Sequence, residues 1–243
     1  MACCRGEWVV VGSRSGGVVV VDLDDTLYAQ RSFLVGAIGA VAERATSLGF
    51  DRNTFADAFT SVLKRGSDTG KTIDDTLEAL GCSSNDVLTA RGPLVEAFIN
   101  FRPLSMSCYD GVIESLDALS RRTLLACLTD GNPDLQRAKL QSLGVAHYFD
   151  AVVITDELGG RSCRKPNPVG LEALSRALGL EVSESLIIGD RVDKDVALAQ
   201  RVGVPVIRVR QGEYRDVPSP LGVATVDNFP EAAALVIAEF LAT

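Results

Sequence analysis

Three aspartates follow a run of four valines near the start of the chain, over residues 18–25. The valines predict a buried parallel strand, and open α/β sheets place their active sites at the carboxyl ends of such strands. Asp22 and Asp24 are therefore expected at the mouth of the sheet. Crowded carboxylates repel one another, so a cation is expected between them, most simply Mg²⁺, which prefers oxygen ligands. A capping cluster, in which Asp24 or Asp25 starts the next helix, is the alternative.

A second polar motif, Thr129-Asp130-Gly131-Asn132, follows the expected strand Leu124–Leu128. A hydroxyl, a flexible glycine and successive backbone N–H groups that enter a helix form a cradle for an anion. Thr129, Asp130 and Gly131 are therefore candidate phosphate-binding residues. Ordinary helix capping by Asp130 or Asn132 is the competing interpretation.

A second acidic cluster follows the expected strand Ser185–Ile188. Asp190 comes just after the strand, and Asp193 and Asp195 stand at the start of the next helix. Capping accounts for one of these acids but not for three. Lys165 lies between the two motifs and precedes a proline, which biases the lysine backbone toward an extended conformation. A lone Lys-Pro pair is otherwise typical of a surface turn.

All four motifs fall beyond the carboxyl ends of parallel strands, on one edge of one expected sheet. They supply carboxylates for a metal, a hydroxyl and N–H groups for phosphoryl oxygens, and an ammonium group. Together these groups make up a complete phosphoryl-transfer site.

The elements that must position these residues alternate between strand and helix after Pro103, which predicts right-handed βαβ units and a parallel sheet. The expected strands are 18–22, 124–128, 151–154, 185–188, 205–209 and 224–226, and the expected helices are 112–120, 133–143, 167–178, 193–202 and 230–241. The predicted fold is α/β, a three-layer Rossmann-like core of residues 18–30 and 103–243. Residues 1–17 are expected to form a leader.

Residues 31–102 have helical periodicity and no β-branched run, which predicts an inserted small α-helical cap of four or five helices. Because the insert follows Asp22 and Asp24 directly, we expect it to stand over the site as a lid. The segment Gly66–Thr72 imitates a nucleotide-binding P-loop but has too few residues between its glycines. It is expected to be a loop of the cap, where Arg65 or Lys71 could contact a substrate.

The composition narrows the class of protein. The chain has 243 residues, of which 47% are hydrophobic, and a net charge of −8. The charge argues against general nucleic-acid binding, which needs a basic face. Six scattered cysteines and one histidine form no zinc motif. With no apolar run long enough for a signal peptide or a membrane span, we expect a cytoplasmic monomer or homodimer that does not bind membranes. The stretch Arg208–Arg215 is expected at the surface.

The ordered set of motifs resembles the haloacid dehalogenase superfamily of phosphohydrolases. The matching residues are Asp22-Leu23-Asp24-Asp25-Thr26, Thr129, Lys165-Pro166-Asn167-Pro168, and Gly189-Asp190 with Asp195. The place of the helical insert resembles the members that carry a small helical cap, and the likeness covers residues 18–242. Position 25 is Asp where the family often has Gly, and position 130 is Asp where Asn is common.

The resemblance implies a role for each matched residue. Asp22 would be the nucleophile that forms an aspartyl-phosphate, and Asp24 the general acid for the leaving alcohol and then the base that activates water. Thr129 and the following amides would bind phosphoryl oxygens, with Lys165 neutralising charge on them and on Asp22. Asp22, the backbone carbonyl of Asp24 and Asp190 would hold Mg²⁺. Asp195 would orient Lys165 or a metal-bound water.

These roles predict a Mg²⁺-dependent phosphatase that acts on a small soluble phosphomonoester, such as a sugar phosphate, a nucleotide or a phosphorylated acid. A phosphomutase of the same fold would keep all four motifs and is the main alternative. By the same resemblance, dehalogenases lack the second acid of the first motif. Asp24 occupies that position here, so dehalogenation is not expected. A catalytically silent binding protein on this scaffold would be expected to lack at least one of the four motifs, and all four are present.

Overall fold

A parallel sheet forms the centre of the computed structural model, which describes residues 17–66, 70–103 and 105–240. The strands are β1 (Val18–Val21), β2 (Leu124–Thr129), β3 (Ala151–Ile154), β4 (Ser185–Gly189), β5 (Val206–Val209) and β6 (Ala224–Val226). They are all parallel, in the order β3-β2-β1-β4-β5-β6. β1 therefore lies in the interior of the sheet, which explains why all four of its valines are buried.

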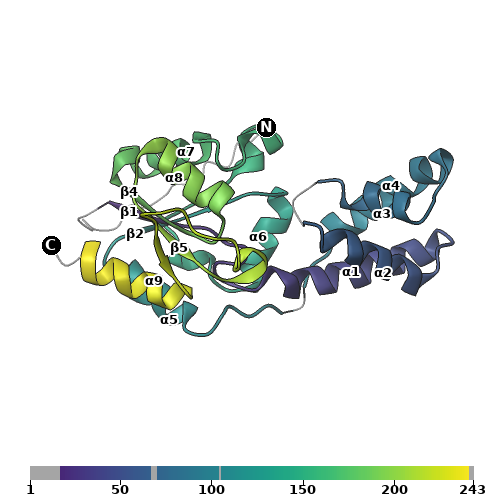
Figure 1. Ribbon diagram of the computed structural model, residues 1–243, viewed down its shortest axis with the longest axis horizontal. Coiled ribbons are helices and arrows are strands. Elements are labelled where there is room, and N and C mark those ends of the chain that lie inside the picture. The colour runs from purple at the N-terminus through teal and green to yellow at the C-terminus, as the bar shows by residue number, and fades with distance from the viewer. Residues whose placement is uncertain (1–16, 67–69, 104, 241–243) are drawn as a thin grey trace, which may run out of the picture.

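Helices cover both faces of the sheet. Side chains alternate along a strand, so Val19 and Val21 face one hydrophobic cluster while Val18 and Val20 face another. The first cluster packs against α5 (Val112–Ser120), α6 (Pro133–Ser142) and α9 (Phe229–Leu235), and the second against α7 (Val169–Leu178) and α8 (Ala197–Val202). Figure 1 shows α5 and α9 below the sheet and α7 and α8 above it. The predicted three-layer α/β fold is confirmed.

Four of the described helices lie within residues 30–99, between β1 and α5. They are α1 (Gln30–Ser47), α2 (Arg52–Leu63), α3 (Thr72–Ala79) and α4 (Ser84–Ile99). They share a hydrophobic cluster of their own, built around Phe55, Phe59, Leu77 and Leu94. Asp51 caps α2, and Ser83 begins α4 in a capping box with Asp86. In Figure 1 these helices extend to one side of the sheet.

The strands begin and end within one residue of their expected positions. One difference follows β4, where the expected helix 193–202 starts as a π-helical turn over Val192–Val196 and becomes α8 only at Ala197. Asp195 lies in this turn, 1% exposed, and accepts a hydrogen bond from the backbone N–H of Arg191. Such π turns are frequent at functional sites. The expected leader lies largely outside the described residues.

Cys127 is fully buried on β2, as a small hydrophobic thiol would be. Among residues 17–66, 70–103 and 105–240, no helix combines the length and the apolar character that crossing a membrane requires.

Candidate active site

The nucleophile candidate Asp22 stands where β1 ends, between β2 and β4. β2 pairs with β1 on one side and is followed by β3, whereas β4 pairs with β1 on the other side and is followed by β5. The strand order therefore reverses at β1, and open parallel sheets bind ligands at such a switch point. The Asp22 N–H donates to the carbonyl of Ile188 at 2.9 Å, which extends the β1–β4 ladder by one residue. Its carboxylate is therefore held at the edge of the sheet, only 7% exposed.

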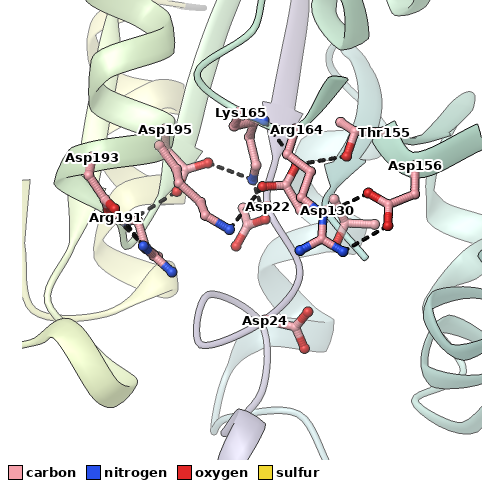
Figure 2. A network of polar contacts seen from close by, with 12 residues as sticks. Asp22, Asp24, Asp130, Thr155, Asp156, Arg164, Lys165, Arg191, Asp193 and Asp195 are labelled. Atoms are coloured by element: carbon pink, nitrogen blue, oxygen red, sulfur yellow. Dashed lines mark hydrogen bonds and ion pairs between the residues drawn. The ribbon is translucent and has the colours of Figure 1, made fainter. Parts of the chain in front are cut away.

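Lys165 reaches this carboxylate from the loop before α7 (Figure 2). Its buried ammonium group donates to Asp22 Oδ1, to Asp195 Oδ1 at 2.7 Å and to the carbonyl of Leu128 at 3.1 Å. These three acceptors match the three N–H bonds of the group. Burial alone would lower the pKa of Lys165, but the charges of Asp195 and Asp22 hold it well above its usual value. A permanent positive charge therefore stands beside the nucleophile candidate.

Burial and the neighbouring charges shift the pKa of Asp22. Burial raises its pKa to about 7, although the charge of Lys165 acts in the opposite direction. The nearby carboxylates of Asp195 and Asp24 add to the increase. A further positive charge near Asp22 would therefore favour the ionised form that a nucleophile needs.

Asp190 is the buried acid that most clearly lacks a partner. It is 2% exposed, and no group of the described residues donates a hydrogen bond to its Oδ2. Burial and the charges of Asp22 and Asp195 raise the pKa of Asp190 well above its usual value. Carboxylate oxygens of Asp22, Asp190 and Asp195 lie within 4.8 Å of one another. Oxygen ligands so close together, one of them unsatisfied, fit a hard divalent cation such as Mg²⁺.

Asp24, the expected acid and base, points away from this cluster in Figure 2. Its Oδ1 accepts hydrogen bonds from Lys139 Nζ at 2.7 Å and from the Tyr28 hydroxyl, and its Oδ2 accepts from Gln136 Nε2 at 2.8 Å. Burial alone would raise the pKa of Asp24, but Lys139 and these hydrogen bonds lower it below its usual value. The side chain is therefore held as a carboxylate.

Thr129 stands at the end of β2 with its side chain buried. Its Oγ1 accepts a hydrogen bond from Gln136 Nε2 at 2.6 Å, so its own hydrogen is available to a phosphoryl oxygen. Gly131, next along, has a φ of 131°, which only glycine adopts easily. Asn132 then caps α6 by accepting from the Leu135 N–H, as the capping interpretation allowed.

The Asp130 side chain bonds to the protein rather than pointing at an anion. Its Oδ1 accepts from the Thr155 hydroxyl at 2.8 Å and from the Lys165 N–H at 3.1 Å, and its Oδ2 lies 3.0 Å from Lys194 Nζ. Burial would raise its pKa, but the charges of Lys165 and Lys194 lower it. The carboxylate thus joins the ends of β2 and β3 to the loop that carries Lys165. Any contact of residue 130 with phosphate falls to its backbone.

Asp25 shapes the turn after the motif and also joins it to a distant loop. It has a φ of 56°, in the left-handed region that glycine favours, which agrees with the frequent Gly of the related family at this position. Its carboxylate accepts from the N–H of Gln30, where α1 begins, and from the N–H of Glu213. A side chain at Gly212 would overlap this carboxyl group.

The prediction that Arg208 lies at the surface is wrong. Its side chain is fully buried because the Asp190 turn and the 212–219 loop enclose the guanidinium group. The guanidinium group donates to the carbonyls of Asp190, Tyr214 and Val217 and to the Ser219 hydroxyl. Arg208 thus joins the backbone of the Asp190 turn to the 212–219 loop. No short-range pattern indicates this, because its partners lie 6 to 18 residues away, both before and after it in the chain.

One cavity of about 350 Å³ brings these residues together. Asp22, Asp24, Thr129, Asp130, Gly131, Lys165, Asp190 and Asp195 all line it. Helices α1–α4 supply an apolar wall that includes Phe59, Ile73 and Phe98, with Arg91 and Asp74 as an ion pair at 2.5 Å. Of the loop residues singled out in sequence, Gly70 and Thr72 line the cavity, whereas Arg65 and Lys71 do not.

The structure adds residues that the sequence motifs do not contain. Gln136 and Lys139 reach Asp24 from α6, and Lys194 reaches Asp130 from the π turn. Gln136 and Lys139 are three residues apart and therefore share a face of α6. Their position on a helix that starts from the Thr129 motif is the one signal that could have pointed to them.

Comparison with known proteins places the chain in a family. The model of the haloacid dehalogenase-like hydrolases matches residues 17–203. The chain belongs to this family. It is 31% identical over 205 residues to a glyceraldehyde 3-phosphate phosphatase of Methanopyrus kandleri, covering 82% of this chain and 86% of the relative. A phosphoglycolate phosphatase of Rhodospirillum rubrum is 37% identical over 125 residues, 51% of this chain and 50% of the relative.

The crystal structure of a 2-haloacid dehalogenase from Pseudomonas syringae has a similar fold to this hydrolase. The TM-score is 0.62 at 25% sequence identity, over 91% of this chain and 98% of the other. The predicted family, fold and phosphatase activity are therefore confirmed.

Proposed function

We propose that this hydrolase removes the phosphoryl group from a small soluble phosphomonoester, with Asp22 as the nucleophile and Mg²⁺ as the cofactor. The observation that carries the proposal is the contact of Lys165 with Asp22 beside the unsatisfied carboxylate of Asp190. A carboxylate attacks phosphorus only when the negative charge of the phosphoryl oxygens is neutralised. Lys165 supplies one neutralising charge here, and a cation held by the aspartates supplies the rest.

In the first step, a carboxylate oxygen of Asp22 forms a bond to phosphorus while the bond from phosphorus to the ester oxygen breaks. Asp24, which is held as a carboxylate before substrate binds, takes up a proton from solvent and then gives that proton to the departing alkoxide. The Thr129 hydroxyl and the backbone N–H groups of residues 130 and 131 donate to the phosphoryl oxygens. The product of this step is an aspartyl-phosphate and a free alcohol.

In the second step, a water molecule attacks the phosphorus of the aspartyl-phosphate and Asp24, now a carboxylate, takes the proton of that water. The bond between phosphorus and Asp22 breaks, which regenerates the Asp22 carboxylate and releases inorganic phosphate. Lys165 stays beside Asp22 throughout because Asp195 and the Leu128 carbonyl hold its other two N–H bonds. Asp195 is thus proposed to position Lys165.

Asp22, Asp190 and the backbone carbonyl of Asp24 are the proposed Mg²⁺ ligands. When bound, Mg²⁺ neutralises charge on the phosphoryl group and on the aspartates that face it. The unsatisfied Oδ2 of Asp190 supports this assignment, because a buried carboxylate oxygen without a donor is otherwise costly.

The cavity supports a small substrate. Its volume of about 350 Å³ and its wall of helical residues leave space for a sugar phosphate, a nucleotide or a phosphorylated acid. The relatives named for glyceraldehyde 3-phosphate and phosphoglycolate act on substrates at the small end of this range. We therefore propose a short phosphorylated sugar or acid as the preferred substrate class.

Replacement of the nucleophile tests this proposal. Asp22→Asn should abolish Mg²⁺-dependent release of phosphate from p-nitrophenyl phosphate, because the amide is not a nucleophile. Asp117→Asn is a matched control, since Asp117 lies on α5 in an exposed ion pair with Arg121. Full activity of Asp22→Asn would refute the mechanism. A panel of metabolite phosphates, compared by kcat/KM, would then identify the substrate of the wild-type protein.

A further inference from the structure

Asp24 is held by two residues of α6 that have no place in the four motifs. Lys139 Nζ lies 2.7 Å from Oδ1 and Gln136 Nε2 lies 2.8 Å from Oδ2, so each carboxylate oxygen has its own donor from the same helix. Lys139 and Gln136 are 6% and 2% exposed. A buried ammonium and a buried amide keep fixed hydrogen-bond partners, because water does not reach them to take the place of those partners.

The Lys139 ammonium is fixed from a second direction. It lies 4.7 Å from the centre of the Phe33 ring, which comes from the beginning of α1 and is buried. This distance is within the range of a cation–π contact. Lys139 is therefore confined between the Asp24 carboxylate and the first turns of the helical segment.

Gln136 joins the same arrangement to the phosphate site. One hydrogen of its amide goes to Asp24 and the other to Thr129 Oγ1 at 2.6 Å. Thr129 is the residue proposed to bind a phosphoryl oxygen. The orientation of Asp24 is thus set relative to the position of the phosphoryl group through a single side chain.

We propose that Lys139, together with Gln136, is a positioning residue for the second half of the reaction, in which Asp24 takes a proton from water. The inference rests on the proposed function, because it assigns these residues to Asp24 as the base. Both Asp24 oxygens act as acceptors in this arrangement, which is the state that a base has before it takes a proton. Attack by Asp22 on a substrate with a good leaving group needs no help from Asp24.

The two steps can be separated with p-nitrophenyl phosphate, whose leaving group departs without an acid. Lys139→Met keeps the length and volume of the side chain but removes its donors. The variant should form the aspartyl-phosphate at the normal rate and hydrolyse it slowly. We expect kcat to fall on the order of 10- to 100-fold, with kcat/KM nearly unchanged; this loss is smaller than the roughly 10²- to 10⁴-fold of general base catalysis because Asp24 itself is kept. KM should fall together with kcat.

Rapid mixing provides the direct measurement. Lys139→Met should release a burst of nitrophenolate equal to the enzyme concentration, and acid quenching should trap ³²P on Asp22 from labelled substrate. Lys139→Arg, which keeps the charge and the donors, should restore part of kcat and reduce the burst. Gln136→Leu should show the same burst in weaker form, and it is the variant to use if Lys139→Met does not fold.

Lys194→Met is the matched control. Lys194 is a second ammonium group at the same cavity, but it forms an ion pair with Asp130 at 3.0 Å, and the variant should give no burst. Equal losses of kcat and kcat/KM without trapped phosphate, or no loss at all in Lys139→Met and Gln136→Leu, would overturn the inference. Failure of the proposed function looks different, because the wild-type protein itself would then release no phosphate and trap none.

Discussion

Replacement of Lys165 by methionine should reveal how much of the stability depends on this single ammonium group. Methionine preserves most of the volume, so the loss comes from the three acceptors that Lys165 satisfies rather than from an empty space. Two of those acceptors, Asp22 and Asp195, are buried carboxylates. Removal of one partner from a buried ion pair costs about 3–5 kcal/mol, and we expect a loss of this size in the free energy of unfolding at pH 8.

The loss should shrink as the pH falls. The pKa of Asp22 is about 7 with Lys165 present, and it rises further without the neighbouring positive charge. At pH 5.5 Asp22 carries a proton in both proteins, so its ion pair contributes little to the wild type. At pH 8 Asp22 is ionised in the wild type, and the variant must either bury an unpaired charge or hold a proton. The difference in stability therefore grows as the pH rises through about 7.

Urea denaturation at pH 5.5 and pH 8, with EDTA present to exclude metal ions, measures this difference. Arg121→Met is the control, because Arg121 pairs with Asp117 on an exposed helix surface. Such exposed pairs contribute at most about 0.5 kcal/mol. A loss below about 1 kcal/mol at pH 8, or a loss that does not depend on pH, would refute the account of Lys165 as the compensating charge for buried acids.

Two other variants test the metal site and the buried arginine. Asp190→Asn should raise the Mg²⁺ concentration needed for half-maximal activity at least about tenfold, because a charged ligand is lost. It should also reduce the increase in Tm that Mg²⁺ produces. An unchanged Mg²⁺ requirement would exclude Asp190 as a ligand. Arg208→Met should lower the free energy of unfolding by about 3 kcal/mol and speed tryptic cleavage after Arg215, since three backbone carbonyls lose their donor. Arg210→Met, which removes only an exposed pair with Asp227, should do neither.

The strands and the motifs at their ends were predictable because their signals are local. Runs such as Val18–Val21 are apolar and β-branched, and the polar residues that follow mark where each strand ends. A shared sheet edge then brings those ends together without any knowledge of the packing. The number of helices within residues 31–102 was predicted only as four or five, because helical periodicity indicates helices more clearly than their boundaries.

The residues around Asp24 and Arg208 could not be predicted, because their contacts join distant parts of the chain. In sequence, Gln136 and Lys139 are ordinary polar residues of a helix with charged neighbours. Only the packing of α6 beside the β1 turn brings them to Asp24. Arg208 occurs in an alternating Arg-Val-Arg pattern typical of a strand with one solvated face, but the following loop covers that face.

The contact between Asp25 and the 212–213 loop has a consequence for how this chain can evolve or be engineered. A side chain at position 212 would overlap the Asp25 carboxyl, whereas glycine at position 25 would leave that space empty and suit the left-handed turn. Gly212 itself has a φ of 66°, a conformation that strains other residues, so the backbone of position 212 and the carboxyl group of position 25 both keep this turn fixed. Mutant libraries that vary the loop around Tyr214 to change substrate preference should therefore keep glycine at position 212, even in a parent with Asp25→Gly.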